Sequence, residues 1–174
     1  MKKRYLLSTI LIINFISLNV MGQKTIQLDQ FQVIGISVRT TNQNGQSQKD
    51  IGNLFGRFMM ENLIEKIPNK ENNDIYCIYT DYESDQTAPY TTIIGCRVSS
   101  LQSIPEGFIS KVIPKTTYQI YTSKGKLPDC VGETWMKIWN ENSPNRKYIA
   151  DFDVYGSKSQ NPTEAEVDTY LSIR

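Results

Sequence analysis

The sequence predicts an α+β fold built from two copies of a strand-helix-strand-strand unit. Several short segments are rich in β-branched and aromatic residues that alternate with polar ones, which is typical of strands. Two other segments carry apolar residues at helical spacing. These segments, IGNLFGRFMMEN at 51–62 and VGETWMKIWNEN at 131–142, share an aliphatic-Gly start, an aromatic, a cation and a final Glu-Asn pair. Because the order of elements repeats as well, we predict a duplication.

The first unit extends over about residues 31–98. Segment 31–41 is β-branched and roughly alternating, so it is predicted as a strand. After a polar loop, Asp50 stands where a helix N-cap is expected, and the apolar helical face that follows ends at Pro68. Segments 75–82 and 90–98 are then predicted as two strands around a polar turn.

The second unit extends over about residues 107–174. An extended stretch opens it, and Pro114 indicates a bend, a bulge or a sheet edge. A helix over 127–142 follows, and segments 148–156 and 166–174 are predicted as strands. Each unit can bury only half of a core, so the two must close on each other around an antiparallel sheet. We therefore predict a pseudo-two-fold axis and a central cleft flanked by the two main helices.

The N-terminal segment has the layout of a secretory signal peptide over residues 1–22. Three cations precede an apolar run, and small or aliphatic side chains stand before the expected cleavage site. A retained membrane anchor is the alternative, but polar residues interrupt the run, which is marginal against the roughly 20 residues of a spanning helix. We expect a single domain over 23–174, secreted or periplasmic, with no stable membrane insertion after cleavage.

Composition excludes several classes of function. The chain contains no histidine, which excludes Ser-His and Cys-His nucleophilic catalysis and the usual zinc sites. Without the signal segment it is slightly acidic, a poor match for nucleic-acid binding. Acidic residues at 81, 83 and 85 resemble part of a calcium loop but lack its glycine and distant glutamate, so a solvated turn is favoured. We predict no catalytic residues, no metal ligands and no cofactor.

The three cysteines leave two interpretations open. If Tyr79 pairs with Ile94 in the hairpin, Cys77 lies across from Cys96, and an exported protein could join them in a disulfide. Two buried, unpaired thiols are at least as compatible with the pattern, because cross-strand disulfide geometry is often strained. Cys130 has no evident partner in either case.

Asp153 is the most informative single position. Alternation along the strand places Asp153 and Tyr155 on one face and Phe152 and Val154 on the other. A carboxylate there either faces water or is held in a pocket, where it favours a cation. When the matching strands of the two units are aligned by Tyr79 and Tyr155, Asp153 corresponds to Cys77. The acid is therefore present in one unit only.

Several motifs in order resemble the GyrI-like effector-binding family, whose members include the ligand-sensing domains of AraC-type and MerR-type regulators. They are IGNLFGRFM, IYCIYTDYESD, YTTIIGCRV, IPEGF, the Trp-bearing helix and DFDVYG, and together they cover nearly the whole chain from about residue 31. The resemblance implies that hydrophobic, often cationic, small molecules bind in an aromatic cleft. It also places Asp153 at the position of a family glutamate, and aspartate is one methylene shorter.

We expect ligand contacts from Asp153, Tyr155, Tyr79, Trp135 and Trp139. The leading hypothesis is a sensor, carrier or sequestering module for a hydrophobic or cationic small molecule, with no nucleic-acid partner. The first alternative is a hydrolase of reactive small molecules in which Asp153 and Tyr79 or Tyr155 activate water. The second is a protein-interaction module, which would show a large exposed apolar patch.

Overall fold

The computed structural model describes residues 24–174. The expected signal peptide lies outside this range. Within the range, no helix combines the length and the apolar character needed to cross a membrane.

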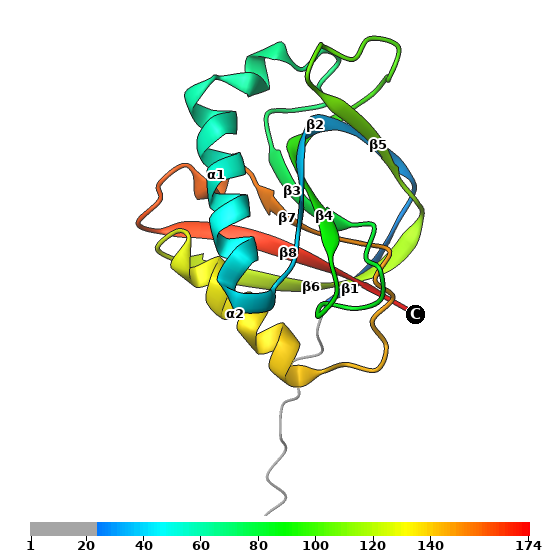
Figure 1. Ribbon diagram of the computed structural model, residues 1–174, viewed down its shortest axis with the longest axis vertical. Helices are drawn as coiled ribbons and strands as arrows, with labels where there is room; N and C mark the ends of the chain where they lie inside the picture. The colour runs from blue at the N-terminus through cyan, green and yellow to red at the C-terminus, as the bar shows by residue number, and fades with distance from the viewer. Residues whose placement is uncertain (1–23) are drawn as a thin grey trace, which may run out of the picture.

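The described residues form an eight-stranded antiparallel sheet and two α-helices (Figure 1). The helices are α1 (Gln46–Met60) and α2 (Asp129–Glu141). The strands are β1 (Thr25–Leu28), β2 (Phe31–Thr40), β3 (Ile75–Thr80), β4 (Tyr90–Val98), β5 (Ile109–Ile113), β6 (Thr116–Gly125), β7 (Ala150–Tyr155) and β8 (Ala165–Ile173). Their spatial order is β1-β6-β8-β7-β3-β4-β2-β5. The predicted α+β class is confirmed.

The sheet curls, so that its two edges, formed by β1 and β5, meet at one corner. β1 pairs with β6 and β2 pairs with β5, and the two ladders have one common register that runs from Thr25↔Gln119 to Gly35↔Ile109. β1 and β2 are thus two arms of one bent strand, and β5 and β6 are the arms of its partner. At the corner the Lys115 ammonium lies 2.7 Å from the Asp29 carboxylate. Pro114, which has no N–H to donate, stands at the corresponding bend.

The break at Pro114 changes the division into units. The sequence suggested one extended stretch over 107–123 that opens the second unit, whereas β5 pairs with β2 of the first half and only β6 belongs to the second. Strand β1 was not predicted at all.

The pseudo-two-fold relation is centred on the β3–β7 pair. These two strands run antiparallel and place Cys77 directly across from Asp153. The flanking strands have equal lengths in the two halves, with β2 matching β6 and β4 matching β8. Cys77 and Asp153, aligned with each other in the repeat, are therefore also neighbours at its axis.

The sheet buries apolar side chains on both faces. Both helices lie on one face (Figure 1), where they cover a cluster that includes Ile34, Ile94, Phe58 and Trp135. The other face is the inside of the curl, and its buried cluster is centred on Phe152, which is surrounded by other aromatic rings. α1 packs mainly on β2 and α2 mainly on β6. The helices are thus held by the sheet, and the seam between them is filled by side chains.

Two local predictions are wrong. Helix α1 begins at Gln46, so Asp50 is not its N-cap; its carboxylate instead accepts hydrogen bonds from the Thr40 hydroxyl at 2.8 Å and from the Gln46 side-chain amide. Strand β3 ends at Thr80 because Asp81 has a left-handed φ of 51°.

The strand end shifts the hairpin register by two residues. Cys77 pairs with Ile94 and Tyr79 with Thr92, whereas Cys96 lies two residues further along β4 and pairs with Ile34 of β2 on its other side. All three cysteines are buried and free, which overturns the disulfide interpretation.

Candidate functional site

Asp153 lies at the centre of β7, between Cys77 of β3 and Thr169 of β8 in the register. Alternation along the strand turns its side chain toward the helices, as predicted, while Phe152 points into the curl. The side chain is 0% exposed, so the solvated interpretation is wrong for this residue.

Three donors surround the Asp153 carboxylate. The Thr169 hydroxyl donates to Oδ1 at 2.6 Å, and the Tyr79 hydroxyl donates to Oδ2 at 2.7 Å. The Trp135 indole N–H lies between the two oxygens, at 3.2 Å from Oδ1 and 3.1 Å from Oδ2. A carboxylate offers about four acceptor positions. The sheet supplies two of these hydrogen bonds, and α2 supplies a single N–H that lies between the two oxygens, so each Asp153 oxygen has two polar contacts from the protein.

Burial and hydrogen bonding act in opposite directions on this group. Burial raises the pKa of Asp153 to about 6 from its ordinary 3.8, while the hydrogen bonds from Thr169, Tyr79 and Trp135 hold the pKa lower than burial alone would set it. Burial, followed by the nearby Asp153 charge, raises the pKa of Tyr79 well above its usual range. Tyr79 therefore remains a protonated donor at neutral pH.

Asp151, two residues earlier on the same strand, provides an internal comparison. It is also 0% exposed, and its Oδ1 accepts hydrogen bonds from the backbone N–H and the hydroxyl of Ser172 at 2.7 Å each. Its Oδ2 accepts hydrogen bonds from Tyr82 at 3.0 Å and from the Arg146 guanidinium at 2.6 Å. The guanidinium carbon lies 4.1 Å from the centre of the Tyr148 ring. Here the chain supplies both the carboxylate and the cation that neutralises it.

Among the described residues, no such cation accompanies Asp153. Within residues 24–174, the ion pairs join other carboxylates, and none of them includes Asp153. Its hydrogen bonds come from neutral groups, and the charge on the same strand, Asp151, repels it. Asp153 is thus a fully buried carboxylate whose oxygens accept hydrogen bonds but whose negative charge is not neutralised by a cation of the described residues.

Aromatic rings form the rest of the surroundings. The Tyr79 and Trp135 rings meet edge to face with centroids 5.0 Å apart, and Trp139 follows at 6.1 Å from Trp135. On the other side, Tyr155 packs edge to face on Phe55 of α1 at 5.2 Å. The five residues expected to contact a ligand are therefore gathered on the helix side of the sheet. Tyr79 and Trp135 are buried, whereas Trp139 and Tyr155 are partly exposed.

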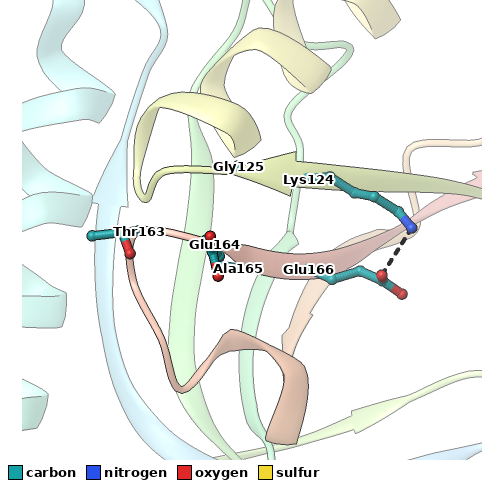
Figure 2. Close-up of a pocket in the computed structure, with 6 residues that line it drawn as sticks. All are labelled: Lys124, Gly125, Thr163, Glu164, Ala165 and Glu166. Carbon is teal, nitrogen blue, oxygen red and sulfur yellow. Dashed lines mark ion pairs between the residues drawn. The ribbon is translucent and has the colours of Figure 1, made fainter.

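The seam between the helices is closed around Asp153. An open hollow of about 330 Å³ lies elsewhere, at the end of β6 and β8, where Lys124 and Glu166 form an ion pair (Figure 2). None of the five expected residues lines that hollow. The Asp153 carboxylate is therefore not accessible from solvent in this structure.

Sequence reasoning missed Thr169, Asp151 and Arg146. Alternation within VDTYL places Thr169 on the buried face of β8, which was the available signal for it. The spacing of Asp151 and Asp153 likewise puts both acids on one face, but nothing in the sequence indicated that Arg146 would lie beside only one of them.

The acidic turn after β3 is a solvated ion-pair network. The Lys111 ammonium lies 2.5 Å from Asp81, and Arg39 lies 2.7 Å from Glu83. Among the described residues, no group of three or more Cys, Asp or Glu side chains is arranged to hold a metal ion.

Comparisons with known proteins agree with the fold and the resemblance. The family model described as "Cass2: Integron-associated effector binding protein" matches residues 25–173. The transcriptional regulator BrlR of Pseudomonas aeruginosa is 23% identical over 160 residues, which are 88% of this chain and 56% of the regulator. The chain thus spans about half the length of this curated relative, and residues 24–174 contain no separate nucleic-acid-binding part.

Solved structures share the whole fold. The integron cassette protein VCH_CASS2 from the mobile metagenome of Vibrio cholerae superposes with a TM-score of 0.67 at 28% identity, covering 87% of this chain and 95% of that one. The structure of SAV2435 bound to tetraphenylphosphonium superposes with a TM-score of 0.73 at 14% identity, covering 87% and 93%. At the latter identity the likeness shows the fold alone.

Proposed function

Because the chain belongs to the family of integron-associated effector-binding proteins, we propose that it binds a small hydrophobic cation in the seam between α1 and α2. Asp153 supplies the countercharge, and Tyr79, Trp135, Trp139 and Tyr155 supply the aromatic walls. The protein acts as a sensor, carrier or sequestering module. Export through residues 1–22, and hence action outside the cytoplasm, is part of this proposal.

The observation that carries the proposal is the unbalanced charge of Asp153. Burying an ionised carboxylate is unfavourable unless a cation pairs with it. At Asp151 the chain meets this requirement with Arg146, which is stacked on an aromatic ring. Asp153 also accepts a hydrogen bond from a tyrosine hydroxyl and also has aromatic neighbours, but no cation of residues 24–174 forms an ion pair with it. A cation from outside the chain would complete the arrangement.

The aromatic rings favour the same class of ligand. A cation over a Tyr or Trp face gains about 0.5 to 2 kcal/mol per ring, with the larger values in desolvated sites. Tyr79 and Trp135 already adjoin the carboxylate. The cationic centre of a ligand would therefore interact with the carboxylate charge and with the aromatic rings at the same time. The relative SAV2435 was solved with tetraphenylphosphonium, a cation of this type, which supports the choice of probe.

Entry is easiest through the partly exposed rings. Phe55, Tyr155 and Trp139 line the seam near its surface, whereas Trp135 is only 8% exposed and is anchored with the buried side of α2. Rotation of the three outer rings would open a path without unseating the helix. We therefore place the ligand between α1 and α2, above the buried carboxylate.

Calorimetric titration with tetraphenylphosphonium at neutral pH tests the proposal. We expect saturable binding to the wild type and at least tenfold weaker binding to Asp153→Asn, which keeps the shape and removes the charge. Asp168→Asn is the matched control, since Asp168 is a carboxylate on the neighbouring strand that accepts a hydrogen bond from Thr122 outside the seam. Equal affinity of the wild type and Asp153→Asn would remove Asp153 from the site.

The hydrolase alternative is not favoured by the geometry. General-base catalysis needs a carboxylate oxygen with a free acceptor position toward water. Both Asp153 oxygens already accept hydrogen bonds from the protein.

A further inference from the structure

We propose that the Asp153 site selects cations that carry no N–H group, such as quaternary ammonium and phosphonium ions, over protonated amines of the same size. This inference rests on the proposed function and adds a chemical rule for its ligands. It follows from the hydrogen bonds already made to the carboxylate.

The Asp153 carboxylate carries a negative charge, but both of its oxygens already accept hydrogen bonds from the protein. Thr169 and Tyr79 each use one oxygen, and the Trp135 N–H is shared almost equally by both, at 3.2 and 3.1 Å. Two of these donors are the side chains of Thr169 and Tyr79 on the sheet, and both side chains are buried, so packing restricts their rotation away from the carboxylate. Trp135 is held by α2 and by its edge-to-face contact with Tyr79. A ligand therefore meets a negative charge whose lone pairs are already directed at the protein.

The two classes of cation respond differently to such a group. A protonated amine brings an N–H that must find an acceptor once it is buried, and an unpaired buried donor is unfavourable. A quaternary cation has no donor to satisfy, and it interacts with the carboxylate and the ring faces through charge alone. The occupied carboxylate thus disfavours the amine without affecting the quaternary ion.

Asp151 shows the opposite arrangement on the same strand. Its Oδ2 accepts one hydrogen bond from Tyr82 and has a second acceptor position for the Arg146 guanidinium, which donates at 2.6 Å. The chain therefore uses a donor cation where an acceptor position is available. At Asp153 the donor that corresponds to the Arg146 guanidinium is the neutral indole N–H of Trp135.

Calorimetric titration at about pH 8 with benzyltrimethylammonium and N,N-dimethylbenzylamine tests the rule, because both are cations there and they differ by one methyl group. We expect the quaternary ion to bind the wild type at least tenfold more tightly. In Trp135→Phe, which frees the shared acceptor positions, the ratio should fall to within about threefold. Met136→Leu is the control on the same helix, because Met136 is 55% exposed to solvent and is not one of the residues of the site, and it should keep the preference of the wild type.

A second variant protects the test against misfolding of Trp135→Phe. Thr169→Val keeps the side-chain shape and frees an acceptor position on Oδ1, so it too should reduce the ratio. Equal binding of the two probes by the wild type overturns the rule and leaves the proposed function intact if tetraphenylphosphonium still binds. An unchanged preference in a folded Trp135→Phe or Thr169→Val overturns it as well. If none of the three cations binds, the proposed function fails and the rule fails with it.

Discussion

At Asp153 the folded chain keeps a carboxyl group with a pKa of about 6, against 3.8 for an ordinary aspartate. The folded state therefore binds a proton more tightly than the unfolded chain does. As pH rises from about 4 to about 6, the carboxyl ionises in the unfolded chain while the buried native carboxyl keeps its proton, so the unfolded state is favoured and stability falls. A shift of this size corresponds to about 3 kcal/mol at neutral pH. Asp153 thus destabilises the fold at neutral pH, as residues of functional sites often do.

We accordingly predict that Asp153→Asn is more stable than the wild type at pH 7. The gain should be about 1 to 2 kcal/mol, less than the full ionisation penalty because the amide cannot accept every hydrogen bond that the carboxylate accepts. Urea unfolding followed by circular dichroism between about pH 4 and 8 measures it. The gain should disappear near pH 4, where the native wild-type carboxyl is protonated. A variant that is less stable than the wild type at pH 7 would contradict this account.

The contacts of the five expected ligand residues show what a sequence can predict at this scale. Strand alternation places Tyr79, Asp153 and Tyr155 on one face, and helical spacing turns Trp135 toward that face. Hydrogen bonds between distant segments are not specified by such patterns. Thr169 lies 16 residues from Asp153 and Tyr79 lies 74 residues away, so their donor roles depend on strand order and register.

At the scale of elements, a glycine pair permits a close approach of β2 and β4 in the first half of the sheet. Gly35 and Gly95 face each other in the β2–β4 ladder. A Cβ on Gly95 would lie 2.1 Å from the Ile34 carbonyl oxygen and 2.6 Å from the Gly35 Cα, closer than any side chain tolerates. The corresponding pair of the second half is Ile120 and Tyr170, whose side chains are bulky. The close backbone approach that two glycines permit is therefore confined to the first half.

Gly95→Ala should therefore lower the free energy of unfolding by about 2 to 3 kcal/mol, because backbone has to move to admit one methyl group. Gly56→Ala is the control. Gly56 lies in α1 with nothing within 4 Å of the added methyl group, so this change should raise stability by about 0.5 to 1 kcal/mol. Urea denaturation of both variants measures the difference. Two variants of equal stability would mean that the close approach at Gly95 does not constrain the sheet.

Element prediction succeeded where local signals are strong and failed where tertiary contacts decide. Strand 90–98 has the predicted bounds, because an alternating β-branched run follows a clear turn. The start of α1 was misplaced because the Asp50 carboxylate bonds to Thr40 of a neighbouring strand. Strand β1 is short and exposed, and only its pairing with β6 defines it.

At the scale of the whole molecule, the two halves share too much structure to fold separately. The β3–β7 pair joins them at the pseudo-two-fold axis, and the bent ladder of β1 and β2 with β5 and β6 joins them again at the corner. The cluster beneath the helices also draws buried side chains from both halves. The sequence predicted this mutual closure from duplication, but not the exchange of edge strands that completes it.

We therefore expect one cooperative unfolding transition for the full chain and no folded structure in either half alone. The halves would be residues 24–114 and 115–174, divided at the corner where β5 passes into β6. Each isolated half exposes the apolar faces that it buries in the intact protein. The first half also loses the pairing of β3 with β7, and the second half loses the pairing of β7 with β3. Proton–nitrogen correlation NMR spectra of the two fragments, recorded separately and then mixed, measure this. The separate fragments should give spectra with little chemical-shift dispersion. Mixing them should restore the dispersion of the full chain, because each half then regains its partner strands. A well-dispersed spectrum from one fragment alone would show that its unit is an independent domain, and the shared-core account of the molecule would then be wrong.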